Sequence, residues 1–137
     1  MHQVDDNFIR KLFSGKYIFA VIGASNNPAK YGFKIYKQLK DINIKVYPVN
    51  PHEELIQGDK CFENIFQLPK DVDVLNFVVP PEISLKVTKN AINKGFKIFW
   101  YQPGSYNSEV LALHDNLNTK VIAGQCVLLE SMKISSK

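Results

Sequence analysis

Apolar residues along the chain gather in short continuous runs, and segments of mixed apolar and polar residues separate these runs. Each run is rich in β-branched and aromatic residues, which predicts strands buried on both faces of a sheet. The expected strands cover Tyr17–Ile22, Ile44–Val49, Val72–Val79, Lys97–Tyr101 and Lys120–Ala123. Their apolar cores are far shorter than a membrane span, so they indicate a globular core and no membrane partner.

The segments between the runs carry apolar residues at helical spacing. The expected helices cover Val4–Phe13, a segment after Pro28 in which Ile35, Leu39 and Ile42 recur at helical spacing, about Glu82 to Asn93, and Ser108–Leu117. Gly95 follows the third of these and predicts a C-cap. The segment Leu55–Gln67 is less regular and predicts an extended piece followed by one turn of helix.

Strands that alternate with helices predict an α/β fold, here a Rossmann-like doubly wound sheet of about five parallel strands with helices on both faces. A chain of 137 residues fits one domain, which we expect to span residues 1–137. In such sheets ligands bind at the carboxyl ends of the strands, near the point where the strand order reverses. The segments that follow each strand are therefore the places to look for function.

The composition of the chain excludes several classes of ligand and partner. The net charge of +4 suits an anionic small molecule, although it also suits a soluble protein with no such ligand. The lysines are spread through the chain without an arginine-rich face or an aromatic platform, so we expect no nucleic acid. The N-terminal residues lack the basic and apolar pattern of a secretory signal, which predicts a cytoplasmic protein. The 2 cysteines and 3 scattered histidines predict neither a disulfide framework nor a metal site.

The segment after the first strand carries the strongest candidate chemistry. Gly23 ends the strand and would let a phosphate approach the backbone, while Ser25 and Asn27 could cap the next helix or bond ligand oxygens. Lys30 lies in the first helical turn, where a cation opposes the helix dipole unless an anion is bound. The candidate ligand-binding residues here are Gly23, Ala24, Ser25, Asn27, Lys30 and Tyr31. The alternative is an ordinary tight turn with a solvated lysine.

The ends of three later strands add further candidates. They are Asn50, Pro51 and His52 after the second strand, Val79, Pro80 and Pro81 after the third, and Gln102 and Gly104 after the fourth. The first group could shape a ribose or adenine pocket with His52 as a phosphate donor. The two prolines form a stiff apolar lip, and Gln102 could meet a ligand amide. Each group taken alone is also explained as a strand-ending turn or a helix start.

Catalytic motifs are missing from the sequence. It has no Gly-x-Gly-x-x-Gly fingerprint, no Walker loop, no nucleophile elbow and no assembled triad, so no catalytic residue is predicted. Trp100 is expected in the core. Cys126 follows the last strand, and is expected either as a small buried residue or as a thiol that could form a mixed disulfide with a thiol cofactor.

The loop motifs can also be considered together. They are Gly23-Ala24-Ser25-x-x-Pro28, Pro48-Val49-Asn50-Pro51, Val79-Pro80-Pro81, Trp100-x-Gln102-x-Gly104 and the closing Cys126. In this order, at strand ends, they resemble the small stand-alone CoA-binding domain proteins. That family is itself similar to the N-terminal domain of the succinyl-CoA synthetase alpha subunit. The resemblance runs over roughly residues 17–130, nearly the whole chain.

The resemblance implies coenzyme A as the cofactor and assigns roles to the candidate residues. It implies phosphate contacts for Gly23, Ala24, Ser25 and Lys30, a nucleotide border at Asn50, Pro51 and His52, an adenine side at Val79, Pro80 and Pro81, and a pantetheine side at Gln102 and Gly104. The chain departs from the family pattern at His52, where relatives commonly have arginine or lysine. It departs again at Gln125, where arginine is common. Both changes remove a cation from the expected phosphate region.

The resemblance carries over binding but not catalysis, since the synthetase reacts through a phosphorylated histidine in a second domain that these 137 residues do not include. We therefore expect a CoA-binding protein without activity of its own: a cofactor carrier, a sensor or an accessory module. Three alternatives stay open. They are a small NAD(P)-binding oxidoreductase, a subunit of an acyl-CoA synthetase or transferase that needs a partner chain, and a regulatory module with a vestigial pocket. Self-association or an unknown protein partner is compatible with each.

Overall fold

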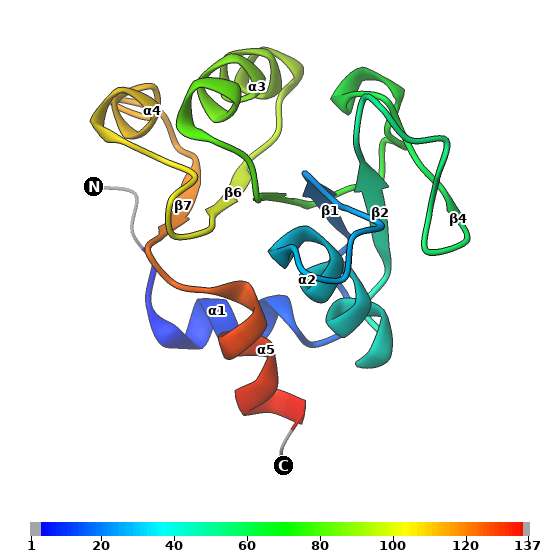
Figure 1. Ribbon diagram of the computed structural model, residues 1–137. Coiled ribbons are helices and arrows are strands. Elements are labelled where there is room, and N and C mark those ends of the chain that lie inside the picture. The colour runs from blue at the N-terminus through cyan, green and yellow to red at the C-terminus, as the bar shows by residue number, and fades with distance from the viewer. Residues whose placement is uncertain (1–3, 136–137) are drawn as a thin grey trace.

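Parallel strands form the central sheet of the computed structural model, which describes residues 4–135 (Figure 1). They are β1 (Phe19–Ile22), β2 (Val46–Val49), β5 (Val74–Phe77), β6 (Ile98–Tyr101) and β7 (Lys120–Ala123). The strand order is β2-β1-β5-β6-β7, and every neighbouring pair is parallel. The order therefore reverses between β1 and β5, and the loops after these two strands flank the switch point. Residues 1–3, part of the segment on which the expected lack of a signal sequence was based, lie outside the described range.

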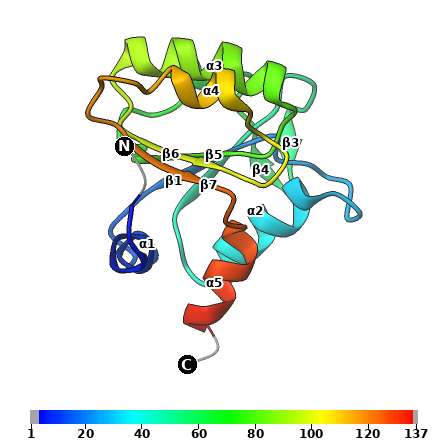
Figure 2. The ribbon, with the colours of Figure 1, turned by 90° about the vertical axis from the view of Figure 1, so that its left-hand side faces the viewer.

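Helices cover both faces of this sheet (Figure 2). On one face lie α1 (Asp6–Leu12), α2 (Tyr31–Asp41) and α5 (Val127–Ser135), and on the other lie α3 (Pro81–Lys94) and α4 (Ser108–Ala112). The predicted fold class is thereby confirmed. Within residues 4–135, no helix is both long and apolar enough to cross a membrane.

The strand side chains divide between two cores, one on each face. On β1, Phe19 and Val21 pack toward α1, α2 and α5, whereas Ala20 and Ile22 pack toward α3 and α4. All four are buried, which explains why the strand is apolar at every position and not only at alternate ones. The strand ends are fixed by this two-sided packing, and the loops that follow them are held at one edge of the sheet.

A small antiparallel hairpin of β3 (Leu55–Ile56) and β4 (Asp59–Lys60) lies beside β2. Its two turn residues, Gln57 and Gly58, have φ values of 50° and 86°, the left-handed region that a two-residue hairpin turn needs at both positions. The expected extended piece is thus a hairpin. The single helical turn predicted after it is confirmed as the 3₁₀ helix Ile65–Gln67.

Two helix predictions need correction. The fourth predicted helix ends at Ala112 and not at Leu117, because the following amides bond three residues back and the chain turns so that His114 is buried. The last helix, α5, was not predicted at all. Its inner positions Val127 and Ser131 are fully buried, so the segment after β7 is part of the fold and not a tail.

Candidate cofactor-binding site

Three backbone segments meet closely at the switch point. A Cβ atom at Gly23 would overlap the carbonyl oxygen of Val78, and one at Gly32 would overlap the carbonyl oxygen of Gly23. Gly23 also has a φ of 99°, which favours glycine. Glycine is therefore required here for packing between the loop after β1, the loop after β5 and the start of α2. This differs from the expected reason, which was the approach of a phosphate.

The β1–α2 loop is folded by its own side chains. Ser25 Oγ accepts a hydrogen bond from the Asn27 amide at 2.9 Å, and Asn27 Oδ1 accepts one from the Ala29 amide at 3.0 Å. The expectation that Ser25 or Asn27 caps α2 is therefore wrong, because both side chains are used within the loop. The N-cap position belongs to Lys30, whose side chain makes no cap bond.

An uncapped helix start has consequences for ligand binding. The amides of the first turn of α2 have no side-chain acceptor, and the exposed Lys30 lies next to them. The Phe33 amide donates to the Lys30 carbonyl oxygen at 3.1 Å, but the positive dipole end of the helix still favours an anion, which would also offset the repulsion between the dipole and Lys30. The geometry of this loop is thus suited to a phosphate.

Asn50 joins the loop after β2 to the loop after β1. Its Nδ2 donates to the Ala24 carbonyl oxygen at 2.9 Å, and its Oδ1 accepts from the His52 amide at 2.8 Å. Ala24 is fully buried, so its backbone and not its side chain is what it offers to neighbours. Pro51 and His52 are exposed at the outer rim of this corner.

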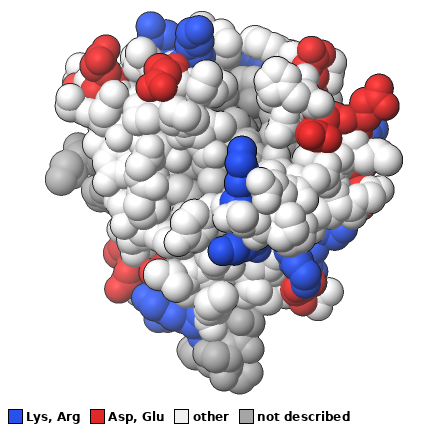
Figure 3. All heavy atoms as spheres, viewed as in Figure 1, with Lys and Arg blue, Asp and Glu red and all other residues white. Residues whose placement is uncertain are grey.

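A cavity of about 650 Å³ opens beside these loops. It is lined by Tyr31, Val78, Val79, Pro80, Pro81, Gln102, Pro103, Gly104, Ser105, Cys126, Leu128 and Leu129. The lining is mainly apolar. It draws on the loops after β5, β6 and β7, on the first residues of α2 and α3, and on α5. Figure 3 shows the molecule from the side on which α2 and α5 face the viewer, where a few basic side chains lie near the centre beside a broad area without charged side chains.

The cavity contains some of the predicted residues and not others. Those that line it are Tyr31, Val79, Pro80, Pro81, Gln102 and Gly104. Those outside its lining are Gly23, Ala24, Ser25, Asn27, Lys30, Asn50, Pro51 and His52. Tyr31 links the two sets because it begins α2 directly after Lys30 and also lines the cavity. The candidates thus form a polar loop corner and an adjoining apolar cavity.

Gln102 makes hydrogen bonds within the protein. It is 5% exposed, its Oε1 accepts from the Val127 amide at 2.6 Å, and its Nε2 donates to Cys126 Sγ at 3.2 Å. These bonds fix the first turn of α5 and position Cys126 at the cavity wall. Much of the hydrogen-bonding capacity of Gln102 is therefore used inside the protein.

The residues that α5 brings to the cavity were missed because the helix was not predicted. Leu128 and Leu129 belong to the first turn of α5, just after Cys126 and Val127, and with Cys126 they line the cavity. The spacing of Val127, Ser131 and Ile134, one face of a helix, was the signal available in the sequence. Cys126 is partly exposed, whereas Trp100 is in the core as expected, with its Nε1 donating to the Gln125 carbonyl oxygen at 2.7 Å.

The chemistry of the lining favours binding. It contains no carboxylate and no histidine, and residues 4–135 hold no cluster of three or more histidine, cysteine or acidic side chains that could bind a metal. The apolar cavity lies beside an uncapped helix start at the switch point of a parallel sheet, the place where Rossmann-like proteins bind their ligands.

Comparison with known proteins shows to which family the chain belongs. Residues 18–132 match the family model described as a CoA binding domain. The chain belongs to this family. The family resemblance predicted from the loop motifs is confirmed.

The curated relatives are larger enzymes. The chain is 33% identical over 116 residues to an ADP-forming acetate–CoA ligase of Methanocaldococcus jannaschii, covering 79% of this chain and 16% of the ligase. It is 42% identical over 79 residues to the alpha subunit of the ADP-forming acetate–CoA ligase II of Pyrococcus furiosus, covering 57% of this chain and 17% of that subunit. The chain therefore spans less than a fifth of the length of either relative.

Solved structures include small proteins of similar size. A conserved hypothetical protein of Pyrococcus furiosus superposes with a TM-score of 0.80 at 43% identity, covering 83% of this chain and 98% of that one. A hypothetical protein of Pyrococcus horikoshii superposes with a TM-score of 0.86 at 30% identity, covering 96% of this chain and 93% of that one.

Proposed function

We propose that this protein binds coenzyme A or an acyl-CoA, with the phosphates at the β1–α2 loop and the pantetheine arm in the apolar cavity. The observation that carries the proposal is the junction at Tyr31. There the uncapped start of α2 meets a cavity of about 650 Å³ lined by prolines and aliphatic side chains. A ligand with a charged nucleotide end and a long, weakly polar arm matches this division.

The roles of the other candidates follow from their positions. The phosphates would lie against Lys30 and the loop residues Gly23, Ala24, Ser25 and Asn27. The Asn50–His52 corner would border the nucleotide. The lip formed by Val79–Pro81 would flank the adenine. Gly104 and the remaining N–H of Gln102 would face the arm.

We further propose that the protein has no catalytic step of its own. The cavity lining holds no histidine, carboxylate or lysine, the commonest general acids and bases, and its polar side chains are Tyr31, Gln102, Ser105 and Cys126. A carrier, a sensor or an accessory module is consistent with that lining. The chain would then act as a single CoA-binding domain.

A second candidate function is that of a CoA-binding part of a larger acyl-CoA ligase. The curated relatives favour it, because this chain matches only 16% and 17% of their length and the rest of each ligase lies outside the match. A partner chain would then supply the reacting groups. Purification of the tagged protein from its native cells, with a ligase subunit retained through gel filtration, would support this candidate. Migration as a monomer or self-dimer would support the first.

Reversing the charge of Lys30 tests the phosphate placement. Lys30→Glu should weaken CoA binding about tenfold at low salt, because two units of charge change within a few ångströms of the phosphates. Added salt should shrink the difference by screening. The measurement is titration calorimetry with CoA at low and at high salt.

The matched control is Lys89→Glu, an equal charge change at an exposed position on α3. It should leave CoA affinity within about twofold of the wild type, since a distant exposed charge is largely screened. Equal affinities for Lys30→Glu and the wild type at low salt would show that the phosphates lie elsewhere.

A further inference from the structure

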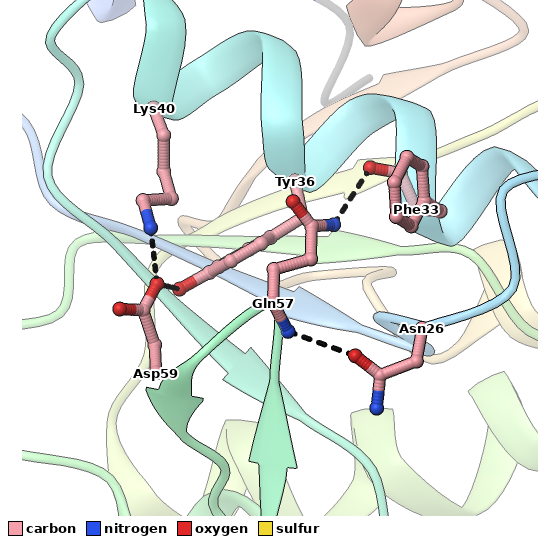
Figure 4. Close-up of polar contacts among 6 residues, drawn as sticks. All are labelled: Asn26, Phe33, Tyr36, Lys40, Gln57 and Asp59. Carbon is pink, nitrogen blue, oxygen red and sulfur yellow. Dashed lines mark hydrogen bonds and ion pairs between the residues drawn. The ribbon is translucent and has the colours of Figure 1, made fainter.

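Asn26 ties the β1–α2 loop to the β3–β4 hairpin (Figure 4). Its Nδ2 donates to the Leu55 carbonyl oxygen at 2.8 Å and to Glu53 Oε2 at 3.2 Å. Its Oδ1 accepts from the Gln57 amide at 2.8 Å. One side chain at the tip of the loop thus uses both its donor group and its acceptor on a segment about 30 residues further along the chain.

The hairpin is itself fixed to α2. Gln57 Nε2 donates to the Phe33 carbonyl oxygen at 3.1 Å. Asp59 Oδ2 accepts from the Tyr36 hydroxyl at 2.6 Å and also pairs with Lys40 (Figure 4). The loop is therefore bonded to the hairpin, the hairpin is bonded to α2, and α2 follows the loop directly in the chain.

Asn26 differs from the neighbouring loop residues in where its side chain bonds. Within the described chain, the other side-chain bonds of the loop tip stay inside the loop: Ser25 bonds the Asn27 amide, and Asn27 bonds the Ala29 amide. Those bonds shape the loop but do not fix it against the rest of the protein. The bonds of Asn26 do, and they reach a hairpin that is held by α2 on its other side.

We propose that Asn26 is a positioning residue, which holds the β1–α2 loop in its ligand-receiving shape before the ligand arrives. The proposal rests on the proposed function, in which this loop receives the phosphates of CoA. A loop that is ordered in advance loses less conformational freedom on binding, and the ligand binds more tightly for that reason. Asn26 itself does not line the cavity.

The test compares wild type and Asn26→Ala by two measurements. In the ligand-free protein, amide hydrogen exchange at Asn27, Ala29 and Lys30 should accelerate about tenfold, because the bonds that protect these amides depend on the loop staying closed. CoA affinity should fall about tenfold, the amount expected when a tether of two to three hydrogen bonds is lost before binding. Slower association should account for part of that loss.

Asn64→Ala is the matched control. Asn64 Oδ1 accepts from the Phe66 amide at 3.0 Å at the start of the 3₁₀ helix, so its removal also costs an asparagine-to-backbone bond. It should lower the melting temperature and leave both loop exchange and CoA affinity unchanged. This separates positioning of the loop from a general loss of stability.

The outcomes distinguish the positioning role from the proposed function. Faster loop exchange together with weaker CoA binding in Asn26→Ala alone supports the positioning role. Unchanged loop exchange in Asn26→Ala overturns it, whatever the wild type binds. Wild-type protein that binds no CoA overturns the proposed function, and the exchange data then still decide whether Asn26 tethers the loop.

Discussion

At the scale of single residues, the polar side chains around the candidate site divide into those used by the fold and those available to a ligand. Gln102 fixes the start of α5, and Asn50 joins two loops. Lys30 has no cap bond and is exposed, and Cys126 lies at the cavity wall. Sequence motifs indicate which residues gather, because strand ends meet at one edge of the sheet. The motifs do not indicate which polar groups are already hydrogen-bonded within the protein, since that depends on contacts between loops.

The two cysteines differ in a way that gives a chemical prediction. Cys126 is partly exposed at the cavity wall, where a pantetheine thiol would lie, while Cys61 is 8% exposed and its Sγ lies 3.5 Å from the Asn50 carbonyl oxygen. Burial raises the pKa of the Cys61 thiol, which lowers its reactive thiolate fraction. CoA disulfide should therefore modify Cys126 and leave Cys61 untouched.

The reaction is a thiol–disulfide exchange. The Cys126 thiolate attacks one sulfur of CoA disulfide, a Cys126–CoA disulfide forms, the original sulfur–sulfur bond breaks and one CoA leaves as its thiolate. Peptide mass mapping should find the adduct on the peptide that contains Cys126, reversible by dithiothreitol and absent in Cys126→Ser. An adduct on Cys61 alone, or none at all, would contradict the placement of the arm.

At the scale of elements, the five strands and the first three helices could be predicted because continuous apolar runs and helical spacing report burial directly. The helix α5 was missed, although it supplies Leu128 and Leu129 to the cavity. Its inner face includes the polar Ser131, held by a bond from its Oγ to the Leu128 carbonyl oxygen, so the apolar pattern is incomplete. The hairpin was missed as a hairpin because Gln57 adopts a positive φ that glutamine rarely takes.

Asp59 makes the stability of the protein depend on pH. The hydrogen bond from Lys40, followed by that from Tyr36, holds the pKa of Asp59 below its usual value of 3.8. In the unfolded chain the carboxyl takes up a proton at higher pH than in the folded protein. The stability that Asp59 contributes is therefore complete above the unfolded pKa and is lost as pH falls through the lower folded pKa.

Asp59→Asn should consequently be less stable than wild type by roughly 0.5–1 kcal/mol at neutral pH, the size expected for a partly exposed ion pair. The difference should shrink as pH falls below about 4. Urea unfolding from pH 7 down to pH 2 measures this. Asp41→Asn, which removes the exposed pair with Lys37, is a control expected to change stability less. A deficit in Asp59→Asn that stays constant to pH 2 would rule out the assigned cause.

At the scale of the whole molecule, fold and family agree on a CoA-binding domain. The sheet order places the loops after β1 and β5 at the switch point, and the family model covers residues 18–132. The oxidoreductase alternative lacks support at the corresponding corner, where β2 is followed by Asn50 and not by the acidic residue of a dinucleotide ribose site.

The measurement that tests the central claim most directly is thermal unfolding of the purified protein with CoA, acetyl-CoA, NAD, NADP, ATP and AMP. A ligand that binds only the folded state stabilises it by mass action, by about 2.7 kcal/mol when its concentration is 100 times its Kd. We predict a higher melting temperature with CoA and acetyl-CoA and little change with NAD or NADP. A shift with NAD or NADP and none with either CoA species would contradict the assignment of the site.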